Sequence, residues 1–125
     1  MAKVILVVDD SATLRASAEY VLRAAGYRVI VAEDGMDGLK KLDELSRKNE
    51  TVNMIITDVN MPNMDGIQFT RMVKSGPHSK APVLILTTES QASKKMEGKA
   101  AGAAGWLVKP FEPDQLVTVV KKLAL

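Results

Sequence analysis

The sequence predicts an α/β protein in which a five-stranded parallel sheet is covered by helices on both faces. Five apolar runs are short and almost continuous, as strands buried on both faces are. Amphipathic stretches alternate with these runs, and such strand and helix alternation is typical of a parallel sheet. A length of 125 residues suits one core, so we expect a single domain over residues 1–125.

The first half of the chain is expected to alternate strand and helix twice. The strands are "VILVV" (4–8) and "RVIVA" (28–32). Apolar residues at helical spacing mark the helix between them: Leu14, Ala18, Val21, Leu22 and Ala25. Gly26 follows and is placed to end that helix. A second helix is marked by Leu39, Leu42 and Leu45.

The second half contains the other three expected strands. They are "NMIIT" (53–57), "PVLIL" (82–86) and "GWLV" (105–108). A third helix is marked by Phe69, Met72 and Val73, and is closed by Gly76 and Pro77. The last helix opens with Pro113 at its first position. Its expected inward-facing residues are Leu116, Val119, Val120 and Leu123.

The segment 90–103 is expected to form a loosely docked helix that faces solvent. Its apolar residues make only a thin stripe, composed of Ala92, Met96 and Ala100. Gly98 interrupts this stripe, and three lysines crowd it.

Composition excludes several classes of protein. The apolar fraction of 46% and the charged fraction of 26% are those of a soluble globular domain rather than a disordered chain. A net charge of +2, from 17 basic and 15 acidic residues, does not indicate binding to nucleic acid or membrane. Without cysteine there is no disulfide or thiol chemistry, and no run resembles a signal peptide or membrane span. We therefore expect a cytoplasmic protein.

Polar residues follow the apolar runs at one edge of the expected sheet. Asp9 and Asp10 follow the first strand, Asp58 the third and Lys109 the fifth, while Thr87 and Thr88 follow the fourth. Ligands of open parallel sheets bind beyond the carboxyl ends of the strands, where these side chains would meet.

Three carboxylates this close would repel by roughly 4 kcal/mol per close pair at an effective dielectric near 20, so a cation must offset them. Oxygen ligands without His or Cys favour Mg²⁺, which keeps waters that a phosphate can replace. Asp58 is thus poised as a nucleophile toward phosphorus.

Each of these residues also has an ordinary structural interpretation. An Asp after a strand is usually a turn former or helix cap, and either Asp10 or Ser11 could cap the first helix. Thr87 alone would bond to backbone, and Lys109 alone would be a solvated lysine. Their joint occurrence at four strand ends favours a functional site.

Four motifs, "VVDDSATLR", "DVNMPNMDG", "LTTES" and "GWLVKPF", together resemble the receiver domain of two-component response regulators. The resemblance covers essentially the whole chain. It implies a doubly wound, flavodoxin-like (βα)5 receiver fold with strand order 2-1-3-4-5. It also implies that the chain catalyses only its own phosphorylation and dephosphorylation and is otherwise no enzyme.

The resemblance further assigns roles to the acidic residues. Asp58 would be the phosphoacceptor, and the side chains of Asp10 and Asp58 would bind Mg²⁺ together with the backbone carbonyl of Asn60. Asp9 would assist the metal through water.

It assigns roles to the other polar residues as well. Thr87 and Lys109 would each bond a phosphoryl oxygen. Pro110 would follow a cis peptide bond, which aims Lys109 back into the site.

Trp106 departs from the family pattern. The family usually has Tyr or Phe here, as an aromatic that turns inward when the residue equivalent to Thr87 is drawn to the phosphate. Tryptophan is bulkier, and its indole N–H needs a partner. Trp106 is therefore either a switch residue or a static core filler.

The sequence ends with the last predicted helix, so we expect no DNA-binding or enzymatic output domain unless the chain is part of a longer regulator. The resemblance is strongest to the stand-alone chemotaxis regulators. It implies a monomer that is phosphorylated by a histidine kinase and then binds the flagellar motor switch protein. The alternative is a phosphorelay shuttle that passes the phosphate to a histidine phosphotransfer protein.

Two other protein classes fit less well. A haloacid-dehalogenase-type phosphatase needs a second Asp two residues after its nucleophile, where this chain has Asn60. A flavodoxin-like flavin carrier needs a hydroxyl-rich phosphate loop after the first strand, whereas "DDSATLR" would repel a phosphate.

Overall fold

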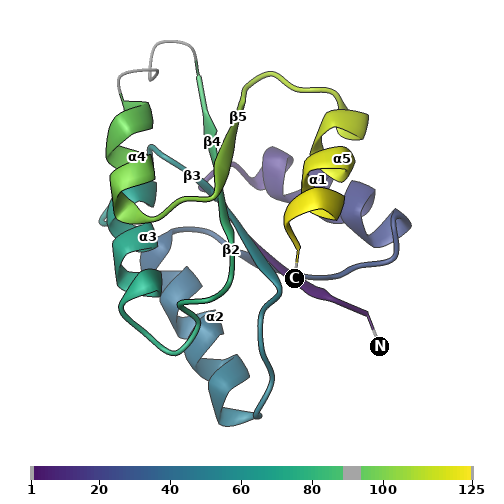
Figure 1. Cartoon of the computed structure of the whole chain (residues 1–125). Helices are drawn as coiled ribbons and strands as arrows, with labels where there is room; N and C mark the ends of the chain where they lie inside the picture. Colours follow the sequence, from purple (N-terminus) through teal and green to yellow (C-terminus); the bar gives the residue numbers. More distant parts are fainter. Residues whose placement is uncertain (1, 89–93, 125) are drawn as a thin grey trace.

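A computed structural model describes residues 2–88 and 94–124 of the chain. Its strands pair in parallel in the order β2-β1-β3-β4-β5, which confirms the predicted fold class (Figure 1). The strands are β1 (Val4–Val8), β2 (Arg28–Ala32), β3 (Met54–Asp58), β4 (Val83–Thr87) and β5 (Gly105–Val108). The helices are α1 (Ala12–Ala24), α2 (Gly35–Arg47), α3 (Gly66–Lys74), α4 (Lys95–Ala101) and α5 (Pro113–Leu123).

The helices form two layers around the sheet. Helices α1 and α5 cover one face, and α2, α3 and α4 cover the other (Figure 1). The two ends of the chain lie together, since Lys3 Nζ donates to the Ala124 carbonyl at 3.2 Å. The carboxyl ends of the strands lie at the opposite end of the sheet, which leaves that end to the polar side chains.

Burial differs between the central and edge strands. Strands β1, β3 and β4 are buried at every residue, as predicted. The expectation of burial on both faces is wrong for β2 and β5, whose residues include partly and fully exposed ones. These two are the edges of the sheet, where helices cover less of the strand.

Strands β3 and β4 lie one residue further along the chain than predicted. Asp58 pairs with Leu86 and Thr87 pairs with Val108, so both polar residues belong to the ladder. Asp is a poor strand former, which is why the sequence pattern stops before it. The pairing with neighbouring strands overrides that local preference and fixes the backbone of Asp58.

The helix ends follow the sequence signals. Ser11, rather than Asp10, caps α1 by accepting a hydrogen bond from the Leu14 N–H at 3.2 Å. Gly26 follows α1 with a φ of 98°, in the left-handed region that glycine tolerates. Pro113 is the first residue of α5, as predicted.

The predicted inward face of α3 is partly wrong. Met72 is 47% exposed, whereas Phe69 and Val73 are buried. Gly66, Ile67 and Thr70 complete the buried set. Met72 borders the apolar stripe, and the spacing of three and four residues alone could not tell which side it takes.

The predicted apolar stripe of α4 is also wrong. Met96 is 82% exposed and Ala100 is exposed, whereas Gly98 and Ala101 are buried. A Cβ atom on Gly98 would lie 2.8 Å from Cδ1 of Ile85. Gly98 is therefore a point of close packing against the sheet rather than an interruption. The part of this prediction that falls on residues 90–93 lies outside the described residues.

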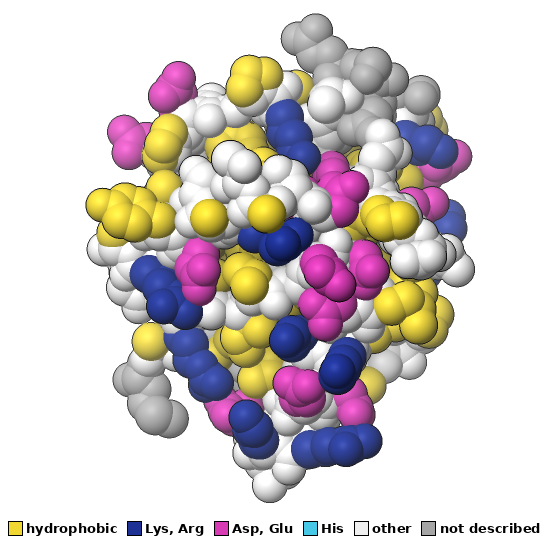
Figure 2. All heavy atoms as spheres, turned by 180° about the vertical axis from the view of Figure 1, so that it is seen from behind, with side chains coloured by type: hydrophobic (Ala, Val, Ile, Leu, Met, Phe, Trp, Pro, Cys, Tyr) yellow, Lys and Arg dark blue, Asp and Glu magenta, His cyan; other side chains and the backbone are white. Residues whose placement is uncertain are grey.

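Charged side chains of both signs are scattered over one face of the molecule (Figure 2). On the face shown in Figure 2, Lys and Arg side chains lie among Asp and Glu side chains. Among the described residues, no helix has the length and apolar character needed to cross a membrane.

Candidate functional site

Asp9 is buried, and all of its polar atoms are bound within the protein. Its backbone N–H donates to the Ala32 carbonyl at 3.1 Å, and its own carbonyl accepts from Arg15 Nη1 at 2.7 Å. Its carboxylate accepts the Ser11 N–H on Oδ1 at 2.8 Å and Lys109 Nζ on Oδ2 at 3.2 Å. Asp9 thus anchors the loop after β1 to β2, α1 and the end of β5.

Three carboxylates meet at the carboxyl end of the sheet. They belong to Asp9, Asp10 and Asp58. One carboxylate oxygen from each of these residues lies within 4.8 Å of the other two. Asp10 is exposed, and within residues 2–88 and 94–124 its carboxylate makes no hydrogen bond or ion pair. The structure therefore brings together the acidic residues that the sequence placed at one edge.

Lys109 is part of this cluster. Its Nζ lies 3.2 Å from Asp9 Oδ2 and 3.3 Å from Asp58 Oδ1, and its side chain is mostly buried. Some of the repulsion between the carboxylates is thus offset by a cation of the chain itself. The Lys109–Pro110 peptide bond is cis.

Asp58 has a raised pKa. Desolvation by burial is the main cause, and the carboxylate of Asp9 adds to it. The ammonium of Lys109 opposes the shift, and so does the hydrogen bond from the Val59 N–H to Oδ1 at 2.9 Å. The ionised Asp58 is therefore less stable here than in water, and more basic as a nucleophile.

The donor set fits a hard divalent cation. The carboxylate of Asp10, which binds no described residue, and the neighbouring carboxylate of Asp58 are the two side chains that could hold such a cation. Mg²⁺ is typically held by one or two carboxylates and several waters, which matches two available ligands beside a saturated Asp9.

We expect Asp10→Ala to melt at a higher temperature than wild type without metal. The substitution removes one of three repelling carboxylates, while Asp9 and Asp58 keep Lys109. The variant should also lose stabilisation by Mg²⁺, which at ten times its dissociation constant should give wild type about 1.4 kcal/mol. Thermal unfolding with and without Mg²⁺ measures both effects.

The control for this experiment is Asp43→Ala, which removes an exposed carboxylate that pairs with Arg47 on α2, outside the cluster. It should keep the full Mg²⁺ effect. A wild-type protein that melts at the same temperature with and without Mg²⁺ would count against a shared site.

Thr87 ends β4 beside the acidic cluster. Its Oγ1 donates to the carbonyl of Thr88 at 3.2 Å, which is the backbone bond expected of a threonine at a strand end. Its own carbonyl accepts the Lys109 N–H at 2.6 Å, so Thr87 and Lys109 are joined through the backbone. Asn60 is exposed two residues after Asp58.

Trp106 lies in β5 and is partly buried against the core beneath α4. The ammonium of Lys95 lies 4.8 Å from the centre of its ring, and a Cβ on Gly98 would come within 3.6 Å of the ring. Such a cation–π contact at a partly exposed site is worth about 0.5–1 kcal/mol. The ring is therefore held by α4 rather than enclosed on every side.

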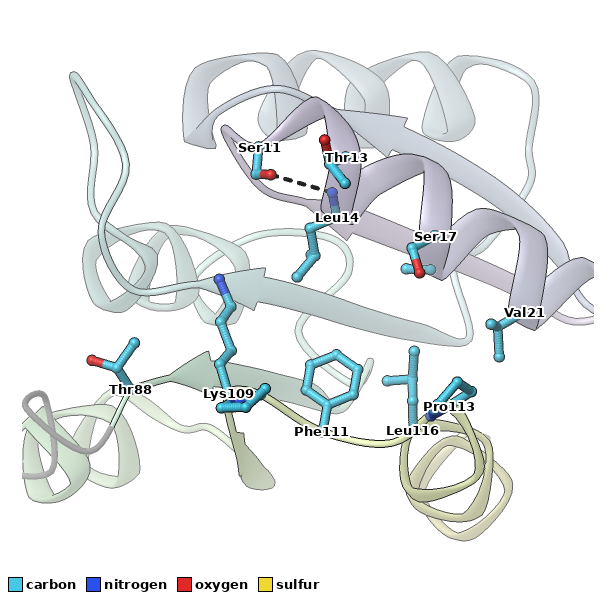
Figure 3. Close-up of a pocket in the computed structure, with 12 residues that line it drawn as sticks. Ser11, Thr13, Leu14, Ser17, Val21, Thr88, Lys109, Phe111, Pro113 and Leu116 are labelled. Atoms are coloured by element: carbon cyan, nitrogen blue, oxygen red, sulfur yellow. Dashed lines mark hydrogen bonds between the residues drawn. The ribbon is translucent and has the colours of Figure 1, made fainter.

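An open groove of about 560 Å³ runs from the site between α1 and α5. Figure 3 shows Leu14 and Phe111 facing each other across it, with Lys109 at one end. Its walls are mostly apolar, and Ser11 and Ser17 lie among the lining residues. The groove reaches Lys109, but none of the three carboxylates lines it.

Sequence reasoning missed two residues that shape the site. Arg15 binds the carbonyl of Asp9, although nothing in its spacing singled it out. Gly66, the first residue of α3, lies so close to the end of β3 that a Cβ would be 1.9 Å from the Asp58 carbonyl oxygen. The sequence signal for Arg15 is that it is a basic residue in the first turn of a helix, where cations are unfavourable.

Comparison with known proteins agrees with this geometry. The sequence model of the response regulator receiver domain matches residues 5–121. The chain is 34% identical over 118 residues to Protein PilG of Pseudomonas aeruginosa, covering 94% of this chain and 84% of that protein. It is 37% identical over 114 residues to Chemotaxis protein CheY1 of Helicobacter pylori, covering 90% of this chain and 89% of that protein.

Solved structures agree as well. A high-resolution structure of the chemotaxis response regulator CheY4 of Vibrio cholerae matches with a TM-score of 0.87 and 41% identity, covering 98% of this chain and 99% of that one. A fold and site of this kind define a signalling module of two-component systems. The chain belongs to the response regulator receiver family, and its relatives include chemotaxis regulators of the CheY type. The phosphatase and flavin-carrier alternatives are therefore set aside.

Proposed function

We propose that the chain is a phosphorylation-activated response regulator that accepts a phosphoryl group on Asp58 from a histidine kinase. The observation that carries this proposal is the pair of unlike oxygens on Asp58. Oδ1 is bound by Val59 N–H and Lys109 Nζ, whereas Oδ2 makes no hydrogen bond or ion pair with any described residue. One oxygen fixes the carboxylate, and the other is available to react.

In the proposed reaction, Oδ2 of Asp58 attacks the phosphorus of a phosphohistidine in line with the bond that breaks. A P–O bond forms as the P–N bond breaks, and the electron pair leaves with the imidazole nitrogen. Water later attacks the phosphorus of the acyl phosphate, which breaks the P–O bond, restores the Asp58 carboxylate and releases inorganic phosphate.

Lys109 pairs with a phosphoryl oxygen, because its Nζ already lies beside Asp58. Thr87 bonds another oxygen once its hydroxyl leaves the Thr88 carbonyl. The side chains of Asp10 and Asp58 and the carbonyl of Asn60 would hold Mg²⁺, which when bound neutralises charge on the phosphoryl oxygens.

We propose that Trp106 reports the state of this site. Beryllofluoride, a phosphoryl mimic, with Mg²⁺ should change the emission of Trp106 and its quenching by iodide beyond the effect of Mg²⁺ alone. Thr87→Ala should greatly weaken this added response while still binding Mg²⁺, because the hydroxyl links the phosphoryl group to the ring. Trp106 is the only tryptophan in the chain, so no label is needed.

Thr88→Ala serves as the matched control, because it removes the adjacent hydroxyl and should respond as wild type does. If Thr87→Ala also responds fully, coupling through the hydroxyl is wrong. Trp106 would then be a core filler.

For the output, we propose that the phosphorylated protein acts in the cytoplasm by binding the flagellar motor switch protein. The similarity to Chemotaxis protein CheY1 and to CheY4 of Vibrio cholerae supports this choice. A pull-down with and without beryllofluoride tests it, with Asp58→Asn as the variant that cannot respond. Recovery of a motor switch protein only with the mimic is the expected result. Recovery of a histidine phosphotransfer protein instead would favour the phosphorelay shuttle.

A further inference from the structure

Arg15 lies at a helix N-terminus, which by itself disfavours a cation. It lies in the first turn of α1, whose N-terminus carries partial positive charge from its unpaired N–H groups. No acidic residue is present in that turn to offset it. The side chain nevertheless reaches back to the loop after β1, where Nη1 donates to the Asp9 carbonyl at 2.7 Å in a partly buried contact.

The carbonyl that Arg15 holds belongs to the peptide unit between Asp9 and Asp10. Because a peptide unit is planar, fixing its oxygen also fixes its N–H and the direction in which the Asp10 Cα leaves it. Asp9 itself is held at its other polar groups, but Asp10 is exposed and its carboxylate binds no described residue. The backbone is thus the restraint on where the Asp10 carboxylate points.

We infer that Arg15 is a positioning residue for divalent-cation binding, which it promotes by clamping the Asp9–Asp10 peptide so that Asp10 faces Asp58. This inference rests on the proposed metal site formed by Asp10 and Asp58. Arg15 suits the task better than Lys, because its planar guanidinium loses less freedom per hydrogen bond and is more weakly hydrated.

Removal of the Arg15 side chain should change the Mg²⁺ affinity in opposite directions under a clamping role and under a purely electrostatic one. Removing a positive charge near an acidic cluster should strengthen the binding of a cation. Removing a clamp on a ligand should weaken it, and the loss of groups that orient metal ligands lowers affinity by about tenfold or more. The sign of the change in Mg²⁺ affinity therefore separates the two roles.

The experiment is a calorimetric titration of the metal-free full chain with MgCl₂ at constant ionic strength. Arg15→Met should bind Mg²⁺ about tenfold more weakly than wild type. Arg15→Lys, which keeps the charge and is the milder change, should be intermediate. Arg23→Met is the matched control, because it removes the same charge from the same helix but breaks only an exposed pair with Glu19. It should bind Mg²⁺ as tightly as wild type or slightly more tightly.

Arg15→Met binding as tightly as wild type, or more tightly, would overturn the clamp. A lower melting temperature with unchanged Mg²⁺ affinity would do the same, since it would show a purely structural role. If Arg15→Met does not fold, Arg15→Lys decides the question by the same measurement. Absence of Mg²⁺ binding in wild type and Arg23→Met alike would instead refute the metal site, and the role of Arg15 with it.

Discussion

Acetyl phosphate with Mg²⁺ is expected to add one phosphoryl group to the wild-type chain and none to Asp58→Asn. In the cluster, the carboxylate of Asp58 is buried and lies beside the ammonium of Lys109. It also has one oxygen, Oδ2, that no described residue binds. Asn is nearly isosteric but its amide is a far weaker nucleophile toward phosphorus. Intact-mass analysis of both proteins, followed by peptide mapping, measures the loss. Labelling of Asp58→Asn at the wild-type level would defeat the assignment.

The same variant carries its own test of folding. Because the pKa of Asp58 is raised in the folded state, the folded protein binds this proton more tightly than the unfolded chain does. Stability contributed by Asp58 therefore falls as pH rises from its unfolded-state pKa through its folded-state pKa, and stays reduced above it. Asp58→Asn should accordingly melt higher than wild type near neutral pH, and this difference should shrink in acid. Loss of labelling with a raised melting temperature cannot be attributed to misfolding.

The matched control for labelling is Asp65→Asn, seven residues along the chain. Asp65 caps α3 by accepting the Gln68 N–H at 2.7 Å, and Asn caps helices as well as Asp does. Asp65→Asn should therefore be labelled as wild type is.

The sequence could predict that Asp9, Asp58 and Lys109 lie at one edge of the sheet. Their placement depends only on which residues follow each strand and on the parallel direction of the strands. In a parallel sheet the residues that follow each apolar run meet at the same end, whatever the side chains are. The bridge that Lys109 makes between Asp9 and Asp58 could not be predicted in the same way. It depends on side-chain rotamers and on the path of the loop after β5.

The errors on α3 and α4 share a physical cause. Periodicity identifies an apolar stripe, but Met72 and Met96 lie at its margin or outside it, and methionine tolerates exposure as well as burial. The sequence pattern makes Gly98 an interruption, because glycine weakens helices. Its contact with Ile85 shows that the lack of a side chain was the useful property, which only the packed neighbour reveals.

Gly66→Ala is expected to destabilise the protein by at least about 3 kcal/mol, which lowers the melting temperature by on the order of 10 °C. A Cβ at this position would lie 1.9 Å from the Asp58 carbonyl oxygen and 2.9 Å from its carbonyl carbon. Both atoms belong to the backbone of a buried strand, so relief requires α3 to move away from β3. The hydrogen bond from the Gly66 N–H to the Val59 carbonyl at 2.8 Å would be strained by that movement.

Helix propensity alone predicts the opposite sign, because alanine is favoured over glycine within helices by about 1 kcal/mol. Gly76→Ala is the control, since the nearest atom to its Cβ would be the Met72 carbonyl oxygen at an ordinary 3.5 Å. Denaturant unfolding of the three proteins should place Gly76→Ala close to wild type and Gly66→Ala far below it. An unchanged stability for Gly66→Ala would show that α3 can shift freely against β3.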